Sequence, residues 1–479
     1  MSYSRQFTNI RKFIRQSMKS WKVPGVALAI IKNGKVIFSE GFGYRDIKNK
    51  KKVTAQTIFA IASCSKAFTT MAMGVLADEK KLDWDKPVKE YMPEFRLFDS
   101  FSTERITPKD LVTHRSGLPR HDNVWYKSKL KRNELMKRLA YLEPTKDLRT
   151  LYQYNNLMFM AAGVLVEKIS GMSWENFIQQ KIFNPLNMKN SNCSVSETPK
   201  FPDYSLPYLQ QKNKIKMIPF LDIDAIGPAG SINSCISDMS NWVLLHLNQG
   251  KFKKKIIIST DQIKQMHTPQ MINSDPNPFS EMKFINYGLG WSVQSYRGYK
   301  MVTHGGSIDG FMSRTSFMPD AKIGVIALIN LDSSPFAQIV TYKAFDVMLG
   351  LKSIDWNQRF KAEKRKSKNE ENKKKRKIQR ERKKGAKPTH SLKEYAGEFE
   401  HPGYGIAKVE LKGNRLELIY NTIRFKSKHY HYDVFLFKNP EHESQLLVKY
   451  QLNTQGKIAQ LSLPFENAGK EVIFTKKNG

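Results

Sequence analysis

The spacing of hydrophobic positions divides the chain into stretches of different structure. Residues 5–18 place an apolar side chain on one helix face every three or four positions, with arginines and lysines between them, which predicts an amphipathic helix. The following segment is apolar over 26–31, polar at Asn33-Gly34 and strand-like over 35–42. Because Asn-Gly favours a tight two-residue turn, this segment predicts a β-hairpin.

Two later stretches, 63–77 and 157–170, carry apolar residues on most of their surface. Such a composition is typical of helices buried in a core, and Gly171 is a suitable residue to end the second one. The run 299–303 is strand-like and precedes two glycines. These elements all belong to the part of the chain before Leu351.

The pattern changes past that point. Residues 359–387 contain few apolar side chains and no sustained heptad, so they predict a solvated linker or a single exposed helix. From Ser391 onward, short alternating runs separated by turn residues predict a small antiparallel sheet or barrel. The predicted strands are 409–411, 416–420, 430–437, 446–452, 458–463 and 472–475. The resulting division is a first domain at 1–354, a basic and partly helical linker at 355–390, and a small barrel at 391–479.

Charge modifies this picture mainly in the linker. The chain carries a formal net charge of +35, of which the linker supplies about a third. A clustered basic stretch is electrostatically suited to nucleic acid or anionic lipid, so a weak contact of 359–387 with anionic surfaces stays open. The run lacks interleaved aromatic residues and a recognisable binding fold, so specific nucleic-acid recognition is not expected.

Residues that bind metals or form disulfides are sparse. Three cysteines are too few for a disulfide framework and show no paired metal spacing. They are Cys64, Cys193 and Cys235. The pairs Asp222/Asp224 and His429/His431 lack the further ligands that calcium or zinc sites need. With no phosphate-binding or dinucleotide-binding loop in the sequence, we expect no metal and no cofactor.

The sequence also bears on the compartment. Residues 5–18 lack the continuous apolar core of a signal peptide, and no apolar stretch is long enough to span a bilayer. We therefore expect a cytoplasmic protein without a transmembrane segment. A periplasmic or secreted location stays open as the alternative.

The first candidate for chemistry is Ser63-Cys64-Ser65-Lys66, at the start of the first apolar helix. Residues three positions apart share a helix face, so Lys66 lies one turn from Ser63. Burial disfavours a charged lysine and makes it a base for the hydroxyl beside it. The helix N-terminus also favours a developing anion at the serine. The alternative is a capped surface helix, because Ser-x-x-Lys also arises by chance.

The second candidate is Tyr154-Asn155-Asn156, just before the second apolar helix. A lysine ammonium favours the phenolate form of a neighbouring tyrosine, so Tyr154 is expected to take the serine proton or relay it to a leaving group. Asn156 is expected to offer its amide to Lys66 and to a substrate carbonyl. An isolated tyrosine here is more often a ring packed in the core.

The third candidate is His304-Gly305-Gly306, which precedes Ser307. Glycines let a substrate lie against a strand edge, with the Ser307 N–H directed at the site. Together with the Ser63 N–H, it would form a two-donor oxyanion hole. His304 is expected at the rim, where an imidazole orients substrate or assists proton transfer. A lone histidine before two glycines is otherwise typical of a turn.

The order and spacing of Ser-x-x-Lys, Tyr-x-Asn and His-x-Gly resemble the serine β-lactamase and penicillin-binding-protein superfamily, in particular its class C-like branch. The resemblance extends over about residues 7–351. The further matching segments are Phe59-Ala60-Ile61-Ala62, Leu82-Asp83-Trp84-Asp85-Lys86-Pro87-Val88, Ile106-Thr107-Pro108, His114-Arg115-Ser116-Gly117-Leu118-Pro119, Pro228-Ala229-Gly230-Ser231 and Tyr287-Gly288-Leu289-Gly290-Trp291. A shorter match, Leu392-Lys393-Glu394-Tyr395-Ala396-Gly397-Glu398-Phe399, resembles the opening of the lipocalin-like domain attached to some of these hydrolases.

The resemblance implies an α/β (α+β) fold, a sandwich of an antiparallel sheet with flanking helices and a helical subdomain, followed by the small antiparallel barrel. It implies that Ser63 is the acylated nucleophile and that Lys66 and Tyr154 form the proton-transfer pair. Asn156 would orient the substrate, and the backbone N–H groups of Ser63 and Ser307 would bind the oxyanion. In the barrel, a packed interior is expected rather than a ligand cavity.

His304 stands where the true β-lactamases of this superfamily have the lysine of Lys-Thr-Gly. A neutral imidazole holds a β-lactam carboxylate less firmly than a lysine does. We therefore expect a serine hydrolase that acts through an acyl-enzyme on small-molecule or short-peptide esters and amides, with His304 and Gly306 against the substrate. An esterase or D-amino-acid-type peptidase is expected rather than an efficient β-lactamase. The alternatives are a penicillin-binding-protein-like carboxypeptidase or β-lactamase, and a catalytically retired binding module.

Overall fold

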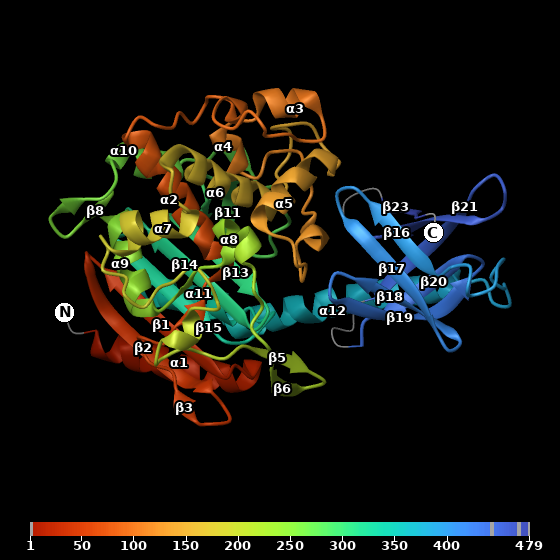
Figure 1. The fold of residues 1–479 in the computed structure, drawn as a ribbon. Helices are drawn as coiled ribbons and strands as arrows, with labels where there is room; N and C mark the ends of the chain where they lie inside the picture. The colour runs from red at the N-terminus through yellow and green to blue at the C-terminus, as the bar shows by residue number, and fades with distance from the viewer. Residues whose placement is uncertain (1–2, 441–444, 467–470, 478–479) are drawn as a thin grey trace.

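The computed structural model describes residues 3–440, 445–466 and 471–477, and it shows a large mixed α/β body and a small barrel joined by a long helix (Figure 1). Within these residues, nine strands form the main sheet in the order β10-β11-β12-β13-β14-β15-β1-β2-β3. Every neighbouring pair is antiparallel. The strands are β1 (Gly25–Lys32), β2 (Lys35–Asp46), β3 (Lys51–Lys52), β10 (Met271–Ile272), β11 (Met282–Tyr287), β12 (Ser292–Tyr296), β13 (Tyr299–Ile308), β14 (Phe311–Met318) and β15 (Ile323–Ile329).

Helices cover both faces of this sheet, so its central strands are apolar on both sides. In β1, Val26, Leu28 and Ile30 belong to the core formed with α1 and α11. The alternate residues Ala27 and Ala29 belong to the core that contains α2, α6 and α9. The helices are α1 (Ser4–Trp21), α2 (Ser65–Asp78), α3 (Ser100–Arg105), α4 (Pro108–Leu111), α5 (Arg132–Arg138), α6 (Asn156–Ser170), α7 (Trp174–Ile178), α8 (Gly227–Gly230), α9 (Ile236–Leu247), α10 (Thr260–Met266), α11 (Phe336–Met348) and α12 (Trp356–Glu381). The sandwich expected from the sequence is confirmed.

The local predictions for this body are also confirmed. The hairpin β1–β2 turns at Asn33 (φ 49°) and Gly34 (φ 74°), both in the left-handed region that a tight hairpin turn requires. Helix α6 ends at Gly171, whose φ of 72° is the left-handed cap that favours glycine. Separate two-stranded sheets lie outside the main sheet, and the one that bears on the site pairs β4 (Phe59–Ala60) with β7 (Asn233–Ser234).

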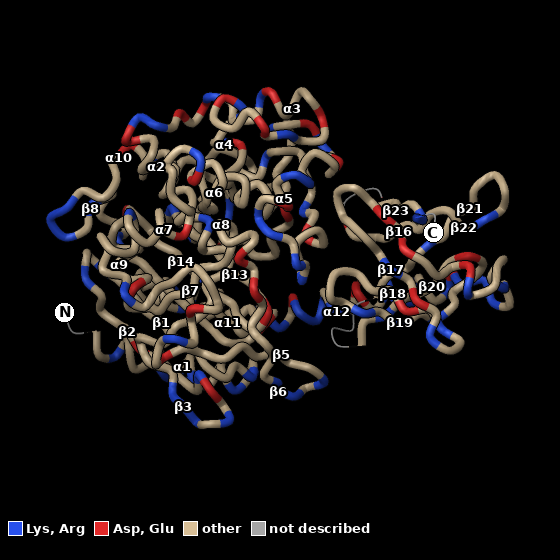
Figure 2. The backbone as a smooth tube through the Cα atoms, in the orientation of Figure 1, with Lys and Arg blue, Asp and Glu red and all other residues tan. Residues whose placement is uncertain are grey.

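The basic segment forms the long helix α12, which matches the exposed-helix alternative. Its first turn is anchored, because Trp356 and Phe360 are buried and the Trp356 indole donates to Asp346 Oδ2 at 2.9 Å. The rest of the helix is largely exposed. Lysine and arginine positions recur along the part of it that is visible in Figure 2. Two buried aromatic side chains therefore hold the first turn of α12 in place.

In the described part of the C-terminal region, eight strands close into a barrel. They are β16 (Gly397–His401), β17 (Gly405–Lys412), β18 (Arg415–Tyr420), β19 (Ile423–His431), β20 (Val434–Lys438), β21 (Gln445–Leu452), β22 (Ile458–Leu463) and β23 (Val472–Lys476). The single strand predicted at 430–437 is wrong, because the chain reverses at Tyr432 (φ 43°) between β19 and β20. Aromatic rings such as Tyr395, Phe435 and Tyr450 fill the interior, with centroids 5.0–5.8 Å apart. The barrel predicted at 391–479 also includes residues 441–444, 467–470 and 478–479, which lie outside the described residues.

Among the described residues, no single helix is both long enough and apolar enough to cross a bilayer. The stretches Asn156–Ser170 and Trp174–Phe183 meet these criteria when taken as a pair, and they are bent by 77° relative to each other.

Candidate active site

Ser63 lies where the chain passes from the short strand β4 into helix α2. It occupies a 3-10 turn, Ala62–Cys64, in which Ala62 has a φ of 47°. A left-handed conformation at a non-glycine residue costs about 1–3 kcal/mol and persists only where the surroundings hold it. Here the Ser65 hydroxyl donates to Ala62 O (2.7 Å) and accepts from the Ile232 N–H (3.0 Å). The candidate nucleophile therefore lies on a strained turn that is tied to its neighbours.

Three polar groups enclose the Lys66 amine. Nζ lies 3.2 Å from Ser63 Oγ, 2.7 Å from Asn156 Oδ1 and 2.8 Å from Ala229 O. Burial, together with the positive charge of Arg120, lowers the pKa of Lys66 well below its ordinary value. Because Asn156 Oδ1 and Ala229 O can only accept, a neutral amine donates to both and directs its lone pair at the serine hydroxyl. This is the arrangement of a general base for Ser63.

Tyr154 lies between two basic side chains. Its ring centroid is 4.8 Å from Lys66 Nζ and 5.0 Å from Arg120 Cζ. Burial nevertheless raises the pKa of Tyr154, and the hydrogen bond with Ser63 and the charge of Arg120 only partly offset this. The expectation of a phenolate is therefore wrong. Tyr154 is a neutral phenol and is suited to donating a proton.

Asn156 is the first residue of α6, and its amide is held in one orientation. Oδ1 accepts from Lys66, while Nδ2 donates to Asp122 Oδ1 at 2.9 Å. The preceding Asn155 caps the helix by accepting from the Met158 N–H at 2.9 Å. The predicted contact between Asn156 and Lys66 is therefore present. The amide nitrogen, which carries two N–H groups, also binds Asp122, a residue that no sequence motif had indicated.

His304 is buried rather than placed at the rim. Its Nδ1 lies 2.7 Å from Gly305 O, a group that can only accept, so Nδ1 carries the proton. Nε2 then accepts from the Tyr287 hydroxyl at 2.9 Å. Burial, with a further contribution from the charge of Lys66, lowers the pKa of His304 to about 3. The imidazole is buried and both of its nitrogens are bound, so the expectation of a titratable group at the rim is wrong, while the neutral state agrees with the one expected.

Gly306 is required by a close backbone approach. A Cβ atom at this position would lie 2.0 Å from Ile61 O and 2.3 Å from Ser313 Oγ. At the neighbouring Gly305 the nearest atoms would be 3.7 Å away, which is an ordinary contact. Strand β13 therefore passes directly against the chain that leads into Ser63, and only glycine allows this at residue 306.

One edge of β13 is open beside the nucleophile. In the described register, β12 pairs with β13 only as far as Thr303, and residues 304–308 pair with β14 alone. A cleft of about 600 Å³ follows this edge. Its lining includes the predicted site residues Ser63, Tyr154, His304, Gly306 and Ser307. Across the described residues, no group of three or more His, Cys, Asp or Glu side chains is arranged to hold a metal ion.

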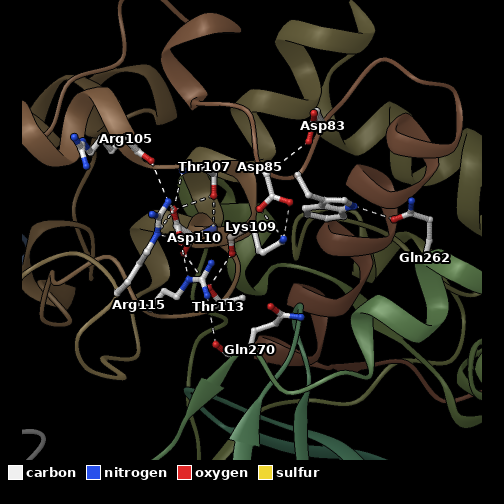
Figure 3. Close-up of polar contacts among 12 residues, drawn as sticks. Asp83, Asp85, Arg105, Thr107, Lys109, Asp110, Thr113, Arg115, Gln262 and Gln270 are labelled. Atoms are coloured by element: carbon white, nitrogen blue, oxygen red, sulfur yellow. Dashed lines mark hydrogen bonds and ion pairs between the residues drawn. The ribbon is translucent and has the colours of Figure 1, made fainter.

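A buried ion-pair cluster supports the segment that leads from α4 toward the site (Figure 3). Asp110 accepts from Arg115 Nε at 2.6 Å and from Arg149 Nη2 at 2.8 Å, and it also caps α4 through the Thr107 N–H at 2.9 Å. Burial acts to raise the pKa of Asp110, but the two arginines and Thr107 outweigh it and hold the pKa below its ordinary value. Further along this segment, His114 Nδ1 accepts from the Asn155 N–H at 3.1 Å.

Comparison with known proteins assigns this chain to a family. A model of the beta-lactamase family matches residues 10–348, which include every candidate site residue. The chain belongs to the beta-lactamase family. A second model, described as a domain of unknown function (DUF3471), matches residues 381–476 and so covers the barrel strands.

The relatives of this family member are distant. It is 27% identical over 377 residues to the unguisins hydrolase ungD of Aspergillus violaceofuscus, covering 72% of this chain and 66% of that protein. It is 25% identical over 337 residues to protein flp of Staphylococcus aureus, covering 70% of this chain and 65% of that protein. The chain thus spans just under two thirds of the length of either relative. The octameric penicillin-binding protein homologue from Pyrococcus abyssi shares the fold, with a TM-score of 0.63 over 98% of this chain and 100% of that chain at 23% identity.

Two arginines in the cleft of this beta-lactamase-family protein were not indicated by the sequence. Arg120 lines the cleft beside Tyr154 with its side chain half exposed. Arg314 on β14 also lines it and is only 8% exposed. In the described part of the chain, Arg314 Nε has no hydrogen-bond partner. The one sequence signal for Arg120 was its place next to the His114–Pro119 match, while Arg314 lies in an ordinary strand.

Proposed function

We propose that this protein is a serine hydrolase that forms an acyl-enzyme at Ser63. The observation that carries the proposal is the Lys66 amine, which lies 3.2 Å from Ser63 Oγ while its other two neighbours can only accept hydrogen bonds. A buried neutral lysine in this arrangement is a base aimed at one hydroxyl. A pure binding module would have no need of that arrangement, which argues against a catalytically retired protein.

The reaction follows from the protonation states. Ser63 Oγ attacks the substrate carbonyl carbon as its proton passes to Lys66, and a new C–O bond forms. The backbone N–H groups of Ser63 and Ser307 are proposed to bind the oxyanion. The bond to the leaving group then breaks, with the neutral phenol of Tyr154 as the proton donor that Lys66 recharges. Water attacks the acyl-enzyme through the same groups in reverse and restores the free serine.

The substrate class is proposed from the cleft. The open edge of β13 suits an extended backbone, which favours esters and amides of short peptide-like molecules. Arg120 and Arg314 supply the positive charge that His304 lacks, so an anionic group on the substrate has partners in this cleft. We therefore propose an esterase or D-amino-acid-type peptidase. The two arginines favour carboxypeptidase-type cleavage of a peptide with a free carboxylate as the second candidate.

The relatives support hydrolysis as the reaction type. The Aspergillus relative is named a hydrolase of unguisins, and the family model spans most of this chain. At 27% identity the relative carries no information on the substrate of this protein.

A fluorophosphonate probe tests the nucleophile. We expect one covalent adduct, located at Ser63 by mass spectrometry of the digested protein, and no adduct in Ser63→Ala with an unchanged thermal melting curve. Loss of a nucleophile removes several orders of magnitude in rate because its helpers cannot act alone. Equal labelling of the Ser63→Ala variant would remove Ser63 from the mechanism.

Matched substrates test the preference. We expect turnover of p-nitrophenyl acetate or butyrate and far weaker turnover of nitrocefin. A peptide ending in D-alanine, compared with its C-terminal amide, isolates the contribution of the carboxylate. Preference for the free acid that disappears in Arg314→Gln would support the carboxypeptidase candidate. A nitrocefin efficiency above the ester value would contradict the esterase and peptidase proposal.

A further inference from the structure

Asp122 connects the active site to a loop that none of the motifs includes. Its Oδ1 accepts from Asn156 Nδ2 and from Trp125 Nε1, each at 2.9 Å. Its Oδ2 accepts from Arg120 Nε at 2.6 Å. The carboxylate therefore binds three donors, one of which belongs to the residue that binds Lys66.

This contact decides which way the Asn156 amide points. A carboxylate can only accept, so it must face the amide nitrogen of Asn156 and not its oxygen. The oxygen is thereby turned to Lys66 Nζ, 2.7 Å away. If the Asn156 amide rotated by half a turn, its N–H groups would face Lys66 Nζ. They would then hydrogen-bond to the lone pair of the lysine, which is the pair of electrons that accepts the serine proton. Asp122 opposes that rotation.

The barrel binds the same stretch of chain. We call residues 120–127 the support loop. Asn421, in the turn between β18 and β19, donates from Nδ2 to Asn123 O at 3.0 Å and to Tyr126 O at 2.9 Å. His121 Nδ1 lies 2.6 Å from the hydroxyl of Tyr404 in the barrel. Both neighbours of Asp122 in the sequence are thus in contact with the barrel.

We propose that Asp122 is a positioning residue for the lysine base, which holds the Asn156 oxygen toward Lys66, and that the C-terminal barrel keeps the support loop in place for this task. The proposal rests on the proposed acyl-enzyme function. It accounts for the hydrogen bonds that join the barrel to the loop beside the site. A peripheral addition would have no reason to contact the two residues that flank Asp122.

The first test is the rate of Ser63 labelling by the fluorophosphonate probe in full-length Asp122→Asn. This change keeps the shape of the side chain but lets the Asn156 amide rotate. Loss of a hydrogen bond to a charged group corresponds to a rate reduction of about 10- to 100-fold. Asp203→Asn is the matched control, because Asp203 is similarly exposed (23% against 26%) and also binds an arginine, Arg45. We expect the control to label at the wild-type rate.

A double-mutant cycle shows whether Asp122 acts through Asn156. If it does, Asp122→Asn lowers the rate in wild type but changes it less than about threefold in Asn156→Ala, because the two residues act as one unit. An equal reduction in both backgrounds would overturn the proposal. The thermal stability of Asn156→Ala and of Asp122→Asn is measured by circular dichroism. Equal melting curves separate a catalytic defect from a folding defect.

The pH dependence of the labelling rate is a further test, because a purely structural role of Asp122 would not shift its acidic limb. The titratable or charged groups that act on Lys66 or respond to it are Arg120, Asp122, Cys64, Tyr154, His114 and His304. The negative charge of Asp122 raises the pKa of Lys66, so its removal lowers that pKa. We expect the acidic limb of the labelling profile to move to lower pH in Asp122→Asn and to stay in place in Asp203→Asn. An unmoved limb would overturn the placement of the Asp122 charge beside the lysine base.

Asn421→Ala tests the part played by the barrel and remains informative if Asp122→Asn does not fold. It removes the two hydrogen bonds that Asn421 donates to the support loop and leaves the charge of Asp122 in place. We expect labelling to slow by about two- to tenfold with the acidic limb unchanged. Asn414→Ala, in an exposed turn of the same barrel, is the control with no expected change. Wild-type labelling by Asn421→Ala would overturn the role of the barrel, whereas absence of labelling in wild type would overturn the proposed function itself.

Discussion

One added methyl group at Gly306 is expected to disable the site, whereas the same group one residue earlier is expected to be tolerated. In Gly306→Ala the new Cβ would lie 2.0 Å from Ile61 O and 2.3 Å from Ser313 Oγ. The Ser313 hydroxyl donates to this same Ile61 oxygen at 2.6 Å. The methyl group therefore enters the contact that joins strand β13 to the chain just before Ser63.

The size of the effect follows from these distances. A carbon atom approaches a carbonyl oxygen to about 3.3 Å at the closest, so β13 and the segment before Ser63 must separate by about 1.3 Å. Overpacking of this kind costs about 1–3 kcal/mol in stability. A displacement of about 1 Å between catalytic groups costs about 100-fold in rate. Both effects are expected, because the strand carries Ser307 and the displaced segment carries Ser63.

The assay compares Gly306→Ala with Gly305→Ala in thermal unfolding and in the second-order rate of fluorophosphonate labelling. At Gly305 the new Cβ would meet Arg314 Nη1 and Ser313 O at 3.7 Å, which requires no movement. We expect Gly305→Ala to keep its melting temperature and to label within about threefold of wild type. Equal labelling rates for the two variants would refute the argument that the close approach of β13 positions the nucleophile.

Three further outcomes are expected. Asp110→Ala leaves the Arg115 and Arg149 charges without their buried partner and should lower the free energy of unfolding by about 3–5 kcal/mol in denaturant titrations. Because the pKa of Asp110 is held below its ordinary value, its contribution is full above that value and is lost as pH falls through the folded-state pKa, so the difference from wild type should shrink in acid. Lys66→Met should lower labelling by about 100- to 10,000-fold and remove the acidic limb, and a retained limb would exclude Lys66 as the base. His114→Phe leaves the Asn155 N–H unsatisfied and should cost about 1–3 kcal/mol by thermal unfolding, and an unchanged melting temperature would contradict this.

The elements that the sequence predicted are those whose causes are local. A glycine such as Gly171 ends α6 because of its own backbone freedom, and Asn33 with Gly34 turns the first hairpin for the same reason. The error at 430–437 has a local cause as well. Strand-forming residues continue on both sides of the reversal at Tyr432, and the turn is marked by Asp433 without any glycine, proline or asparagine.

Some features of the candidate site were likewise predictable from the local sequence, and others were not. Ser63 and Lys66 share one helix face by spacing alone, and the structure brings Lys66 within hydrogen-bonding distance of Ser63 and Asn156. The protonation state of Tyr154 was not predictable, because it depends on burial by segments distant in the sequence. Arg314 gave no signal either, since an arginine in a strand is common and only the tertiary structure places it in the cleft.

By itself, the sequence determined the family, the sandwich of helices and antiparallel strands, and the residue types available for covalent chemistry. These follow from periodicity and from motifs in which a few neighbouring residues carry the information. The tertiary structure alone decided that His304 is buried with both ring nitrogens bound, that Asp122 orients the Asn156 amide, and that the barrel contacts the support loop. Each of these depends on burial or on a hydrogen bond between segments far apart in the chain. No local pattern encodes such a contact, because its energy exists only once the segments have been brought together and water has been excluded.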